Sequence, residues 1–192
     1  MPPRNQAALD FLQSRRSRPA KLFTHPVPGS EQLTEILTAA LRVPDHGKLE
    51  PWRLVVLQGA AFPRLADLAE ARAHELGGDA EKVAKGRGQY DAGKLAVVVI
   101  SAPKPAPKVP QVEQLLSAGA LCLGIVNAAE AAGWGASWLT GWPAHDAAFT
   151  ARAFGCTDGE SVAGIVHIGT PPPDAPDRPR PDLARLTTWL QA

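Results

Sequence analysis

The stretch of residues 113–132 constrains the fold of this 192-residue chain more than any other segment. It reads as one helix that is apolar nearly all the way round, and a helix without a polar face must be covered on several sides. The small residues that would let another backbone approach it closely are Ser117, Ala118, Gly119, Ala120, Gly124 and Ala128. This helix is therefore expected to lie in the core, against a second copy of the chain, or both, and self-association is the favoured reading.

Short apolar runs predict strands at residues 52–57, 95–100, 134–139 and 162–168. The run at 95–100 is continuously apolar and β-branched, which indicates a strand buried on both faces. Apolar residues at helical spacing predict further helices at residues 7–15, 30–43, 63–77 and 144–154. Asn5, Ser30 and Pro63 are the expected start signals of the first three. Helices before and between strands, without a strict βαβ repeat, favour one α+β layered domain over residues 1–192, with an extended Pro-rich tail from about 170.

Composition and charge exclude several functional classes. The net charge is only +1, so no global field attracts nucleic acid or an anionic membrane. The longest nearly uncharged stretch, residues 115–127, is shorter than the roughly 20 residues that span a bilayer, and the first residues lack a secretory pattern, so a cytoplasmic protein is expected. Cys122 and Cys156 are the only cysteines. They predict neither a disulfide scaffold nor a thiolate metal site, and Cys122 should pack as a small hydrophobe.

Generic catalytic motifs are absent from the sequence. The five histidines, which are scattered and form no metal-ligand spacing, are His25, His46, His74, His145 and His167. Gly133 and Gly135 resemble part of a dinucleotide fingerprint, but they follow a predicted helix, and Trp138 stands where a third glycine is needed. A nucleophile elbow and a phosphate-cradling Walker loop are also missing. No metal and no catalytic protein residue is predicted.

Two polar segments have the chemistry of a ligand site. Arg15, Arg16 and Ser17 end the first predicted helix, and guanidinium forks with a hydroxyl suit phosphate oxygens. Taken alone, this triplet is explained better by basic residues that complement a helix C-terminus, with Ser17 starting a turn. The second segment, residues 42–52, places Arg42 and His46 between prolines in a loop that would face a ligand. The alternative interpretation of this second segment is a turn shaped by its prolines, with Trp52 packed in the core.

Three further segments complete the pattern, at residues 108–119, 132–141 and 168–171. From residue 12 to 171 the chain resembles the FMN-dependent nitroreductase family, in particular its short YdjA-like branch. The resemblance implies a three-layer α+β fold with a central, mainly antiparallel sheet. It also implies a homodimer with FMN at the subunit interface, small-molecule substrates, and no nucleic-acid or membrane partner.

The resemblance also assigns flavin contacts. The residues that match cofactor-binding positions of the family are Arg15, Arg16, Ser17, Arg42, His46, Trp138, Leu139 and Thr140. The first five are expected from one subunit and the last three from its partner. Trp138 serves equally well as a core aromatic, and Leu139 stands where a basic residue is common. Glu50 replaces a glutamine found in many members. The spacing of Arg178 and Arg180 does not decide which of them, if either, reaches the phosphate.

The activity implied by the resemblance is passage of hydride from NAD(P)H through FMN to a small organic acceptor, such as a nitroaromatic or a quinone, in a ping-pong sequence. Protein nucleophiles and acid–base pairs are not needed, because the flavin performs the redox chemistry. Two other classes remain open. A flavin-storage protein would share the anchoring residues without turnover, and a flavin-free dimeric interaction domain would be colourless.

Overall fold

The computed structural model describes residues 3–174 and 178–191. Its α-helices are α1 (Gln6–Ser14), α2 (Ser30–Ala40), α3 (Ala61–Glu75), α4 (Ala80–Asp91), α5 (Gln111–Ala131), α6 (Ala147–Phe154) and α7 (Leu183–Leu186). The strands are β1 (Trp52–Gln58), β2 (Leu95–Ser101), β3 (Gly135–Leu139) and β4 (Ser161–Gly169). Short 3-10 turns are η1 (Ala20–Leu22), η2 (His46–Lys48) and η3 (Trp142–His145).

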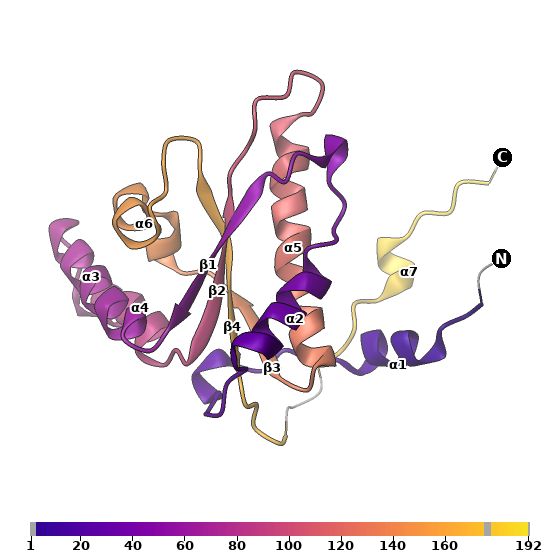
Figure 1. Cartoon of the computed structure of the whole chain (residues 1–192), viewed down its shortest axis with the longest axis horizontal. Helices are drawn as coiled ribbons and strands as arrows, with labels where there is room; N and C mark the ends of the chain where they lie inside the picture. Colours follow the sequence, from indigo (N-terminus) through magenta and orange to yellow (C-terminus); the bar gives the residue numbers. More distant parts are fainter. Residues whose placement is uncertain (1–2, 175–177, 192) are drawn as a thin grey trace.

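The strands form one antiparallel sheet in the order β1-β2-β4-β3. Every residue of β2 is buried, as its continuous apolar run predicts. Helices α2 and α5 cover one face of the sheet, and α3, α4 and α6 cover the other (Figure 1). The predicted three-layer α+β fold with an antiparallel sheet is therefore confirmed.

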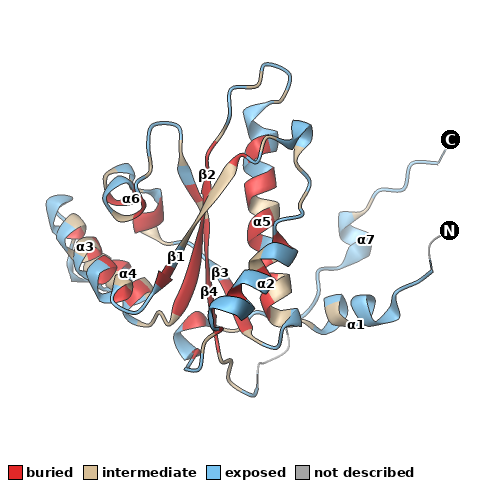
Figure 2. Ribbon diagram, in the orientation of Figure 1, coloured by how far each residue is buried: buried red, intermediate tan, exposed pale blue. Residues whose placement is uncertain are grey.

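Each face of the sheet has its own core. On the α5 side, Leu121 and Ile125 pack against Val97 and Val99 of β2. On the opposite side, Phe149 of α6 packs in the cluster that contains alternate residues of the same strand. Figure 2 shows buried residues concentrated in the sheet and on the helix faces that contact it, whereas α1 and α7 are almost wholly exposed. Cys122 is buried in the first cluster as a small hydrophobe.

Several helix boundaries differ from the prediction. Asn5 caps α1 as expected, with its side chain accepting from the Ala8 amide at 3.1 Å. Ser30 is not a cap: Gly29 occupies that position, and the Gln32 side chain accepts its N–H at 3.1 Å. Helix α3 begins at Ala61, so Pro63 lies inside the first turn, where its missing N–H leaves no bond unmade.

Two parts of the helical prediction need correction. Helix α4 was not expected, because its composition is polar and includes Gly86 and Gly88. The single helix predicted at residues 144–154 is divided into η3 and α6, because Asp146 caps α6 by accepting the Phe149 amide at 2.7 Å.

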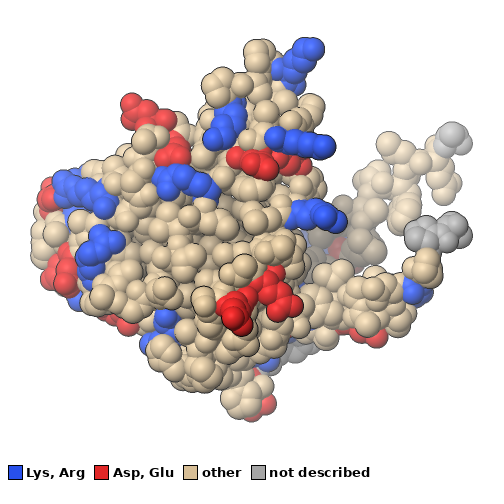
Figure 3. All heavy atoms as spheres, in the orientation of Figure 1, with Lys and Arg blue, Asp and Glu red and all other residues tan. Residues whose placement is uncertain are grey.

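Helix α5, Gln111–Ala131, is longer than the nearly uncharged stretch at residues 115–127. Within the described residues it is the one helix long and apolar enough to cross a membrane. Core helices of soluble proteins pass the same test, and one face of α5 is packed on the sheet. Figure 3 shows acidic and basic side chains interspersed on one face of the molecule, between broad uncharged areas.

Candidate functional site

A basic cavity of about 940 Å³ lies where α1 ends. Its lining includes Arg15, Arg16, Ser17, Arg178 and Arg180. Two arginine side chains that donate to backbone carbonyls join the C-terminal tail to the end of α1. Arg16 donates to the Arg178 carbonyl at 3.1 Å, and Arg180 donates to a carbonyl of α1. Arginine remains protonated in proteins, and its fork matches the oxygens of a phosphate. Four guanidinium groups around one cavity therefore form a site for an anion with several oxygens.

A second cavity of about 380 Å³ adjoins the first and shares Arg15 and Arg16 with it. Arg15 donates from Nε to the Glu130 carboxylate at 2.8 Å, and the Glu130 side chain is only 6% exposed. This ion pair holds Arg15 at the C-terminal end of α5. Arg18 also lines the second cavity, and its buried Nε has no hydrogen-bond partner. An oxygen-rich ligand would supply the missing acceptor.

The loop between α2 and β1 has unusual backbone geometry. Gly47, Lys48 and Glu50 have positive φ angles of 76°, 52° and 48°. Such angles are uncommon for residues other than glycine, and they cluster at ligand-binding sites. The Asp45 carboxylate supports the loop by accepting the backbone N–H of Glu50 at 2.8 Å. The structure thus gives this segment a defined shape and leaves the side chain of His46 exposed.

The two predicted basic segments, one with Arg15 and the other with His46, contact opposite ends of α5. His46 Nδ1 lies 2.6 Å from the carboxylate of Glu113, in the first turn, whereas Arg15 pairs with Glu130 in the last turn. Since an α-helix rises about 1.5 Å per residue, these two glutamates are about 25 Å apart along the helix axis. One flavin mononucleotide does not span that length within a single chain.

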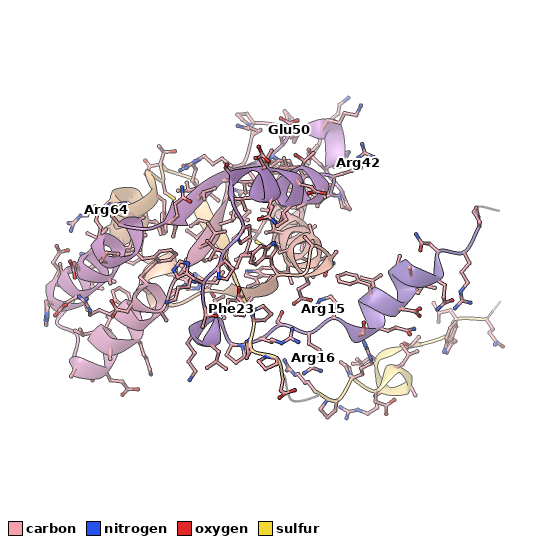
Figure 4. All side chains as sticks on the ribbon, turned by 60° about the horizontal axis from the view of Figure 1, so that its bottom comes forward. Arg15, Arg16, Phe23, Arg42, Glu50 and Arg64 are labelled. Carbon is pink, nitrogen blue, oxygen red and sulfur yellow. The ribbon has the colours of Figure 1, made fainter. Side chains whose placement is uncertain are left out.

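Figure 4 shows the same separation: Arg42 and Glu50 lie on the opposite side of the molecule from Arg15 and Arg16. Arg15 and the pair Arg42 and His46 therefore do not meet within one chain, and which subunit supplies each of them to a flavin site stays a prediction.

The last residues of β3 are half-exposed and point to alternate faces of the sheet. Trp138, 41% exposed, lies on the α5 side, 3.8 Å from the position of a Cβ on Gly119. It also lies over Gly164 of β4, where a Cβ would be 2.0 Å from the indole nitrogen. Trp138 is therefore partly packed and partly open. Leu139 lines a cavity on the α4 side, and Thr140 is exposed.

The arginine segment and β3 are neighbours within one chain. The Phe23 ring packs against Gly135, where a Cβ would lie 2.8 Å away, and Leu139 lines a cavity with Ala20 and Lys21. The chain that follows Arg15 thus runs along β3. Which subunit supplies Trp138, Leu139 and Thr140 to a flavin site stays a prediction.

That third cavity, of about 210 Å³, contains buried polar groups without partners. Its lining is Pro19, Ala20, Lys21, Gly88, Gln89, Ala92, Leu139 and His167. Both amide atoms of Gln89 and Nε2 of His167 are buried and have no hydrogen-bond partner in the structure. Each such atom costs about 1–3 kcal/mol. An arrangement this costly is a common property of a ligand site.

One face of α5 is apolar and uncovered. Its exposed hydrophobic residues are Val112, Leu115, Leu116 and Leu123. They recur at helical spacing and so form one stripe, which we call the α5 stripe. Gly124 does not belong to it: a Cβ there would lie 2.9 Å from the Ala40 carbonyl oxygen of α2 in the same chain. The small residue at 124 is therefore explained by packing within the core.

The model of the nitroreductase family matches residues 12–170. The chain belongs to the nitroreductase family. A relative from Escherichia coli (strain K12), named "Putative NAD(P)H nitroreductase YdjA", is 34% identical over 164 residues, which is 85% of this chain and 88% of the relative. The family resemblance inferred from the motifs is thereby confirmed, and with it the assignment of this chain to the oxidoreductases.

Solved nitroreductase structures share this fold. A nitroreductase-like protein from Bacillus cereus is 20% identical and matches all of both chains with a TM-score of 0.77. A proposed nitroreductase from Desulfovibrio desulfuricans in complex with FMN is 23% identical, has a TM-score of 0.71, and covers 98% of this chain and 99% of its own.

Several residues that line these cavities were missed in the sequence. Arg18 follows the Arg15–Ser17 triplet directly, so its place in the sequence could have predicted that it lies beside the second cavity. Gln89 and His167 carried no such signal, because they belong to no motif and come together only in the fold, where both line the third cavity. Among the described residues, no three His, Cys, Asp or Glu side chains form a group suited to a metal.

Burial lowers the pKa of His167 to about 4 from its ordinary 6.5, so the folded protein holds it neutral. The unfolded chain binds a proton below pH 6.5 and the folded chain does not, so stability falls as the pH decreases through this window. The loss should reach about 2 kcal/mol at pH 5. Carboxylates with lowered pKa values, such as Glu160, lose their contribution only at lower pH.

Urea unfolding between pH 7 and 5 tests this prediction. His167→Leu should remove most of the pH dependence, whereas the control His74→Leu, at an exposed site on α3, should keep it. Equal pH slopes for His167→Leu and the wild type would contradict the assignment.

Proposed function

We propose that this nitroreductase binds FMN and transfers reducing equivalents from NAD(P)H to a small organic acceptor such as a nitroaromatic or a quinone. The observation that carries the proposal is the basic cavity formed by Arg15, Arg16, Arg178 and Arg180. The names of the relative and of the D. desulfuricans structure, which mention NAD(P)H and FMN, support the choice of donor and cofactor.

The arginines would hold the phosphate of the cofactor. Arg15 is already oriented by Glu130, which reduces the ordering that binding requires. Ser17 hydrogen-bonds to the Arg15 guanidinium at 3.2 Å and can add a hydroxyl to the site. The tail arginines, which the sequence left undecided, both line the cavity. We therefore include Arg178 and Arg180 among the phosphate contacts.

The ring of the cofactor would lie along the end of β3. The ring would contact Trp138, Leu139 and Thr140, because the chain that continues from the arginines to Ala20 and Lys21 lines a cavity together with Leu139. When bound, FMN accepts a hydride from the nicotinamide and passes electrons to the second substrate. The protein residues bind and orient the reactants, which explains why no nucleophile or acid–base pair is needed.

A homodimer would complete the site. The α5 stripe is exposed, and so are the apolar side chains of the tail, among them Leu183, Leu186, Trp189 and Leu190. Exposed apolar surface on this scale marks an interface. If two α5 helices pack antiparallel, the N-terminal end of one lies beside the C-terminal end of the other. The exposed Arg42 and His46 of the second copy would then approach the flavin site of the first.

We propose that the protein works as a cytoplasmic dimer with small-molecule substrates. Helix α5 packs one face on the sheet and would pack the α5 stripe on a second copy. These two contacts account for its apolar composition, so no membrane is needed to explain it.

Initial-rate kinetics test the proposed reaction. If the donor leaves before the acceptor enters the same site, plots against one substrate at several fixed levels of the other should be parallel. Intersecting lines would contradict this order. Bound flavin without turnover with either nicotinamide would instead favour a storage protein.

Replacing Arg16 by alanine should weaken FMN binding by about 10- to 100-fold, because a hydrogen bond to a charged group contributes about 1.5–3 kcal/mol. Arg15→Ala should have a similar effect, but it leaves the buried Glu130 unpaired and should be measured in a Glu130→Gln background. Fluorescence titration with FMN gives the dissociation constants.

The matched control is Arg64→Ala, which removes an exposed arginine from α3, on the other side of the sheet. Its dissociation constant should equal that of the wild type. If the Arg15 and Arg16 variants also bind FMN like the wild type, the phosphate assignment is wrong.

A further inference from the structure

The cavity of about 210 Å³ beside β3 is built from four separate elements. Ala20 and Lys21 come from η1, Gln89 from α4, Leu139 from β3 and His167 from β4. It is smaller than the roughly 300–1,000 Å³ of sites that enclose a whole ligand. It therefore suits one end of a larger molecule. Its walls are mostly apolar, and polar groups gather where α4 meets β4.

His167 is the most buried of these polar groups. Only 3% of the residue is exposed, and Nε2 has no hydrogen-bond partner. Phe62 lies beside the ring, with the two centroids 6.4 Å apart. Burial keeps the imidazole neutral at physiological pH, as described above, so one of its ring nitrogens carries a proton and can donate.

Gln89 adds one donor and one acceptor. Both its amide nitrogen and its amide oxygen are buried without partners. The amide packs closely against Gly141, where a Cβ would lie 2.7 Å from the Gln89 oxygen. Gln89 also lines the cavity, and the last torsion of a glutamine side chain has a broad energy profile, so its amide can turn at low cost.

We propose that Gln89 and His167 bind the hydrogen-bonding edge of the flavin pyrimidine ring, with the apolar part of the ring system against Leu139. This inference rests on the proposed binding of FMN. The pyrimidine edge presents one N–H between two carbonyl oxygens and so requires one acceptor and two donors. The Gln89 amide supplies the acceptor and one donor, and His167 Nε2–H supplies the second donor.

The position of the cavity favours the flavin over other ligands. Leu139 belongs both to this cavity and to the segment that would contact the ring. The phosphate cavity is lined by Arg15 and Arg16, and the chain that continues from them to Ala20 and Lys21 lines this cavity. A flavin whose pyrimidine edge enters this cavity would give hydrogen-bond partners to three buried atoms that lack them, namely both amide atoms of Gln89 and Nε2 of His167.

Replacing Gln89 by leucine gives opposite expectations with and without the cofactor. In flavin-free protein, Gln89→Leu removes two unpaired buried atoms, so the melting temperature should equal or exceed that of the wild type. The variant should therefore fold. With FMN, its affinity should fall about tenfold, because the edge of the ring loses its partners. The matched control is Gln58→Leu at the exposed end of β1.

FMN methylated at N3 identifies the hydrogen bond itself. The wild type should bind the N3-methyl analogue about tenfold more weakly than FMN, and Gln89→Leu should bind the two about equally. His167→Leu should weaken FMN binding as well. These readouts use binding and melting, so they do not depend on turnover.

Other results separate the possible failures. If the wild type binds no FMN, the proposed function is wrong and this inference with it. If the wild type binds FMN and Gln89→Leu binds it equally well, or if the wild type does not discriminate against the N3-methyl analogue, only this inference is overturned. Unchanged FMN affinity with a raised KM for NADH or NADPH would also overturn it and assign the cavity to the nicotinamide carboxamide.

Discussion

A chain carrying Leu116→Glu should sediment as a monomer and bind FMN at least about 100-fold more weakly than the wild type. Leu116 is 66% exposed in the centre of the α5 stripe, so the substitution does not disturb the core of one chain. In the proposed dimer, the glutamate would be an unpaired buried charge, which costs about 3–5 kcal/mol. Flavin binding should fall with assembly, because Arg42 and His46 would come from the second copy.

Leu76→Glu is the matched control, since Leu76 is 42% exposed next to the C-terminal end of α3, on the other side of the sheet. It should remain a dimer with normal flavin affinity. Sedimentation velocity at micromolar concentration measures the assembly, and fluorescence titration measures the binding. If the Leu116 variant remains a dimer, the α5 stripe is not the interface. If it is a monomer that binds FMN like the wild type, the shared site is wrong.

Replacing Gly124 by glutamate should destabilise the fold by more than about 3 kcal/mol. Even a Cβ at this position would lie 2.9 Å from the Ala40 carbonyl oxygen, so α2 must move away from α5. Overpacking of this kind costs about 1–3 kcal/mol. The carboxylate would add repulsion from the carbonyl oxygen and the cost of a buried charge.

Gly124→Ala and Gly88→Ala provide a graded comparison. The first should destabilise, because the clash exceeds the helix propensity gained. The second should stabilise by up to about 1 kcal/mol, because a Cβ at Gly88 has no atom within 4 Å. Urea unfolding of flavin-free protein gives both values. A Gly124→Glu protein that is as stable as the wild type but monomeric would place this glycine at the interface instead.

Local patterns were sufficient to predict the four strands, whereas their antiparallel arrangement was expected only from the family resemblance. The strand predicted at residues 95–100 is β2, Leu95–Ser101, because a continuous apolar run is a strong local signal. Helix α4 was missed because its order depends on distant residues. Gly86 is poor in a helix, yet here it lets the Trp142 ring pack closely, since a Cβ would lie 2.7 Å from that ring. Tertiary packing overrides the weak propensity of the segment.

The site was predictable where it is local in sequence. Arg15 and Arg16 are adjacent and line one cavity, as their motif suggested. The separation of these arginines from Arg42 and His46 within one chain could not be predicted, because nothing in a linear pattern says that the two groups contact opposite ends of α5. The small residues of α5 were similarly ambiguous, and only the structure assigns Gly124 to contact with α2.

Anaerobic titration of the purified, FMN-reconstituted protein with NADH and with NADPH tests whether it is a flavoenzyme that a nicotinamide reduces. We expect a yellow protein whose oxidised-flavin absorbance is lost on addition of at least one of the two donors and returns when a quinone or a nitroaromatic is added. A protein that retains no flavin after incubation with FMN, or a flavoprotein that neither nicotinamide reduces, would contradict this expectation.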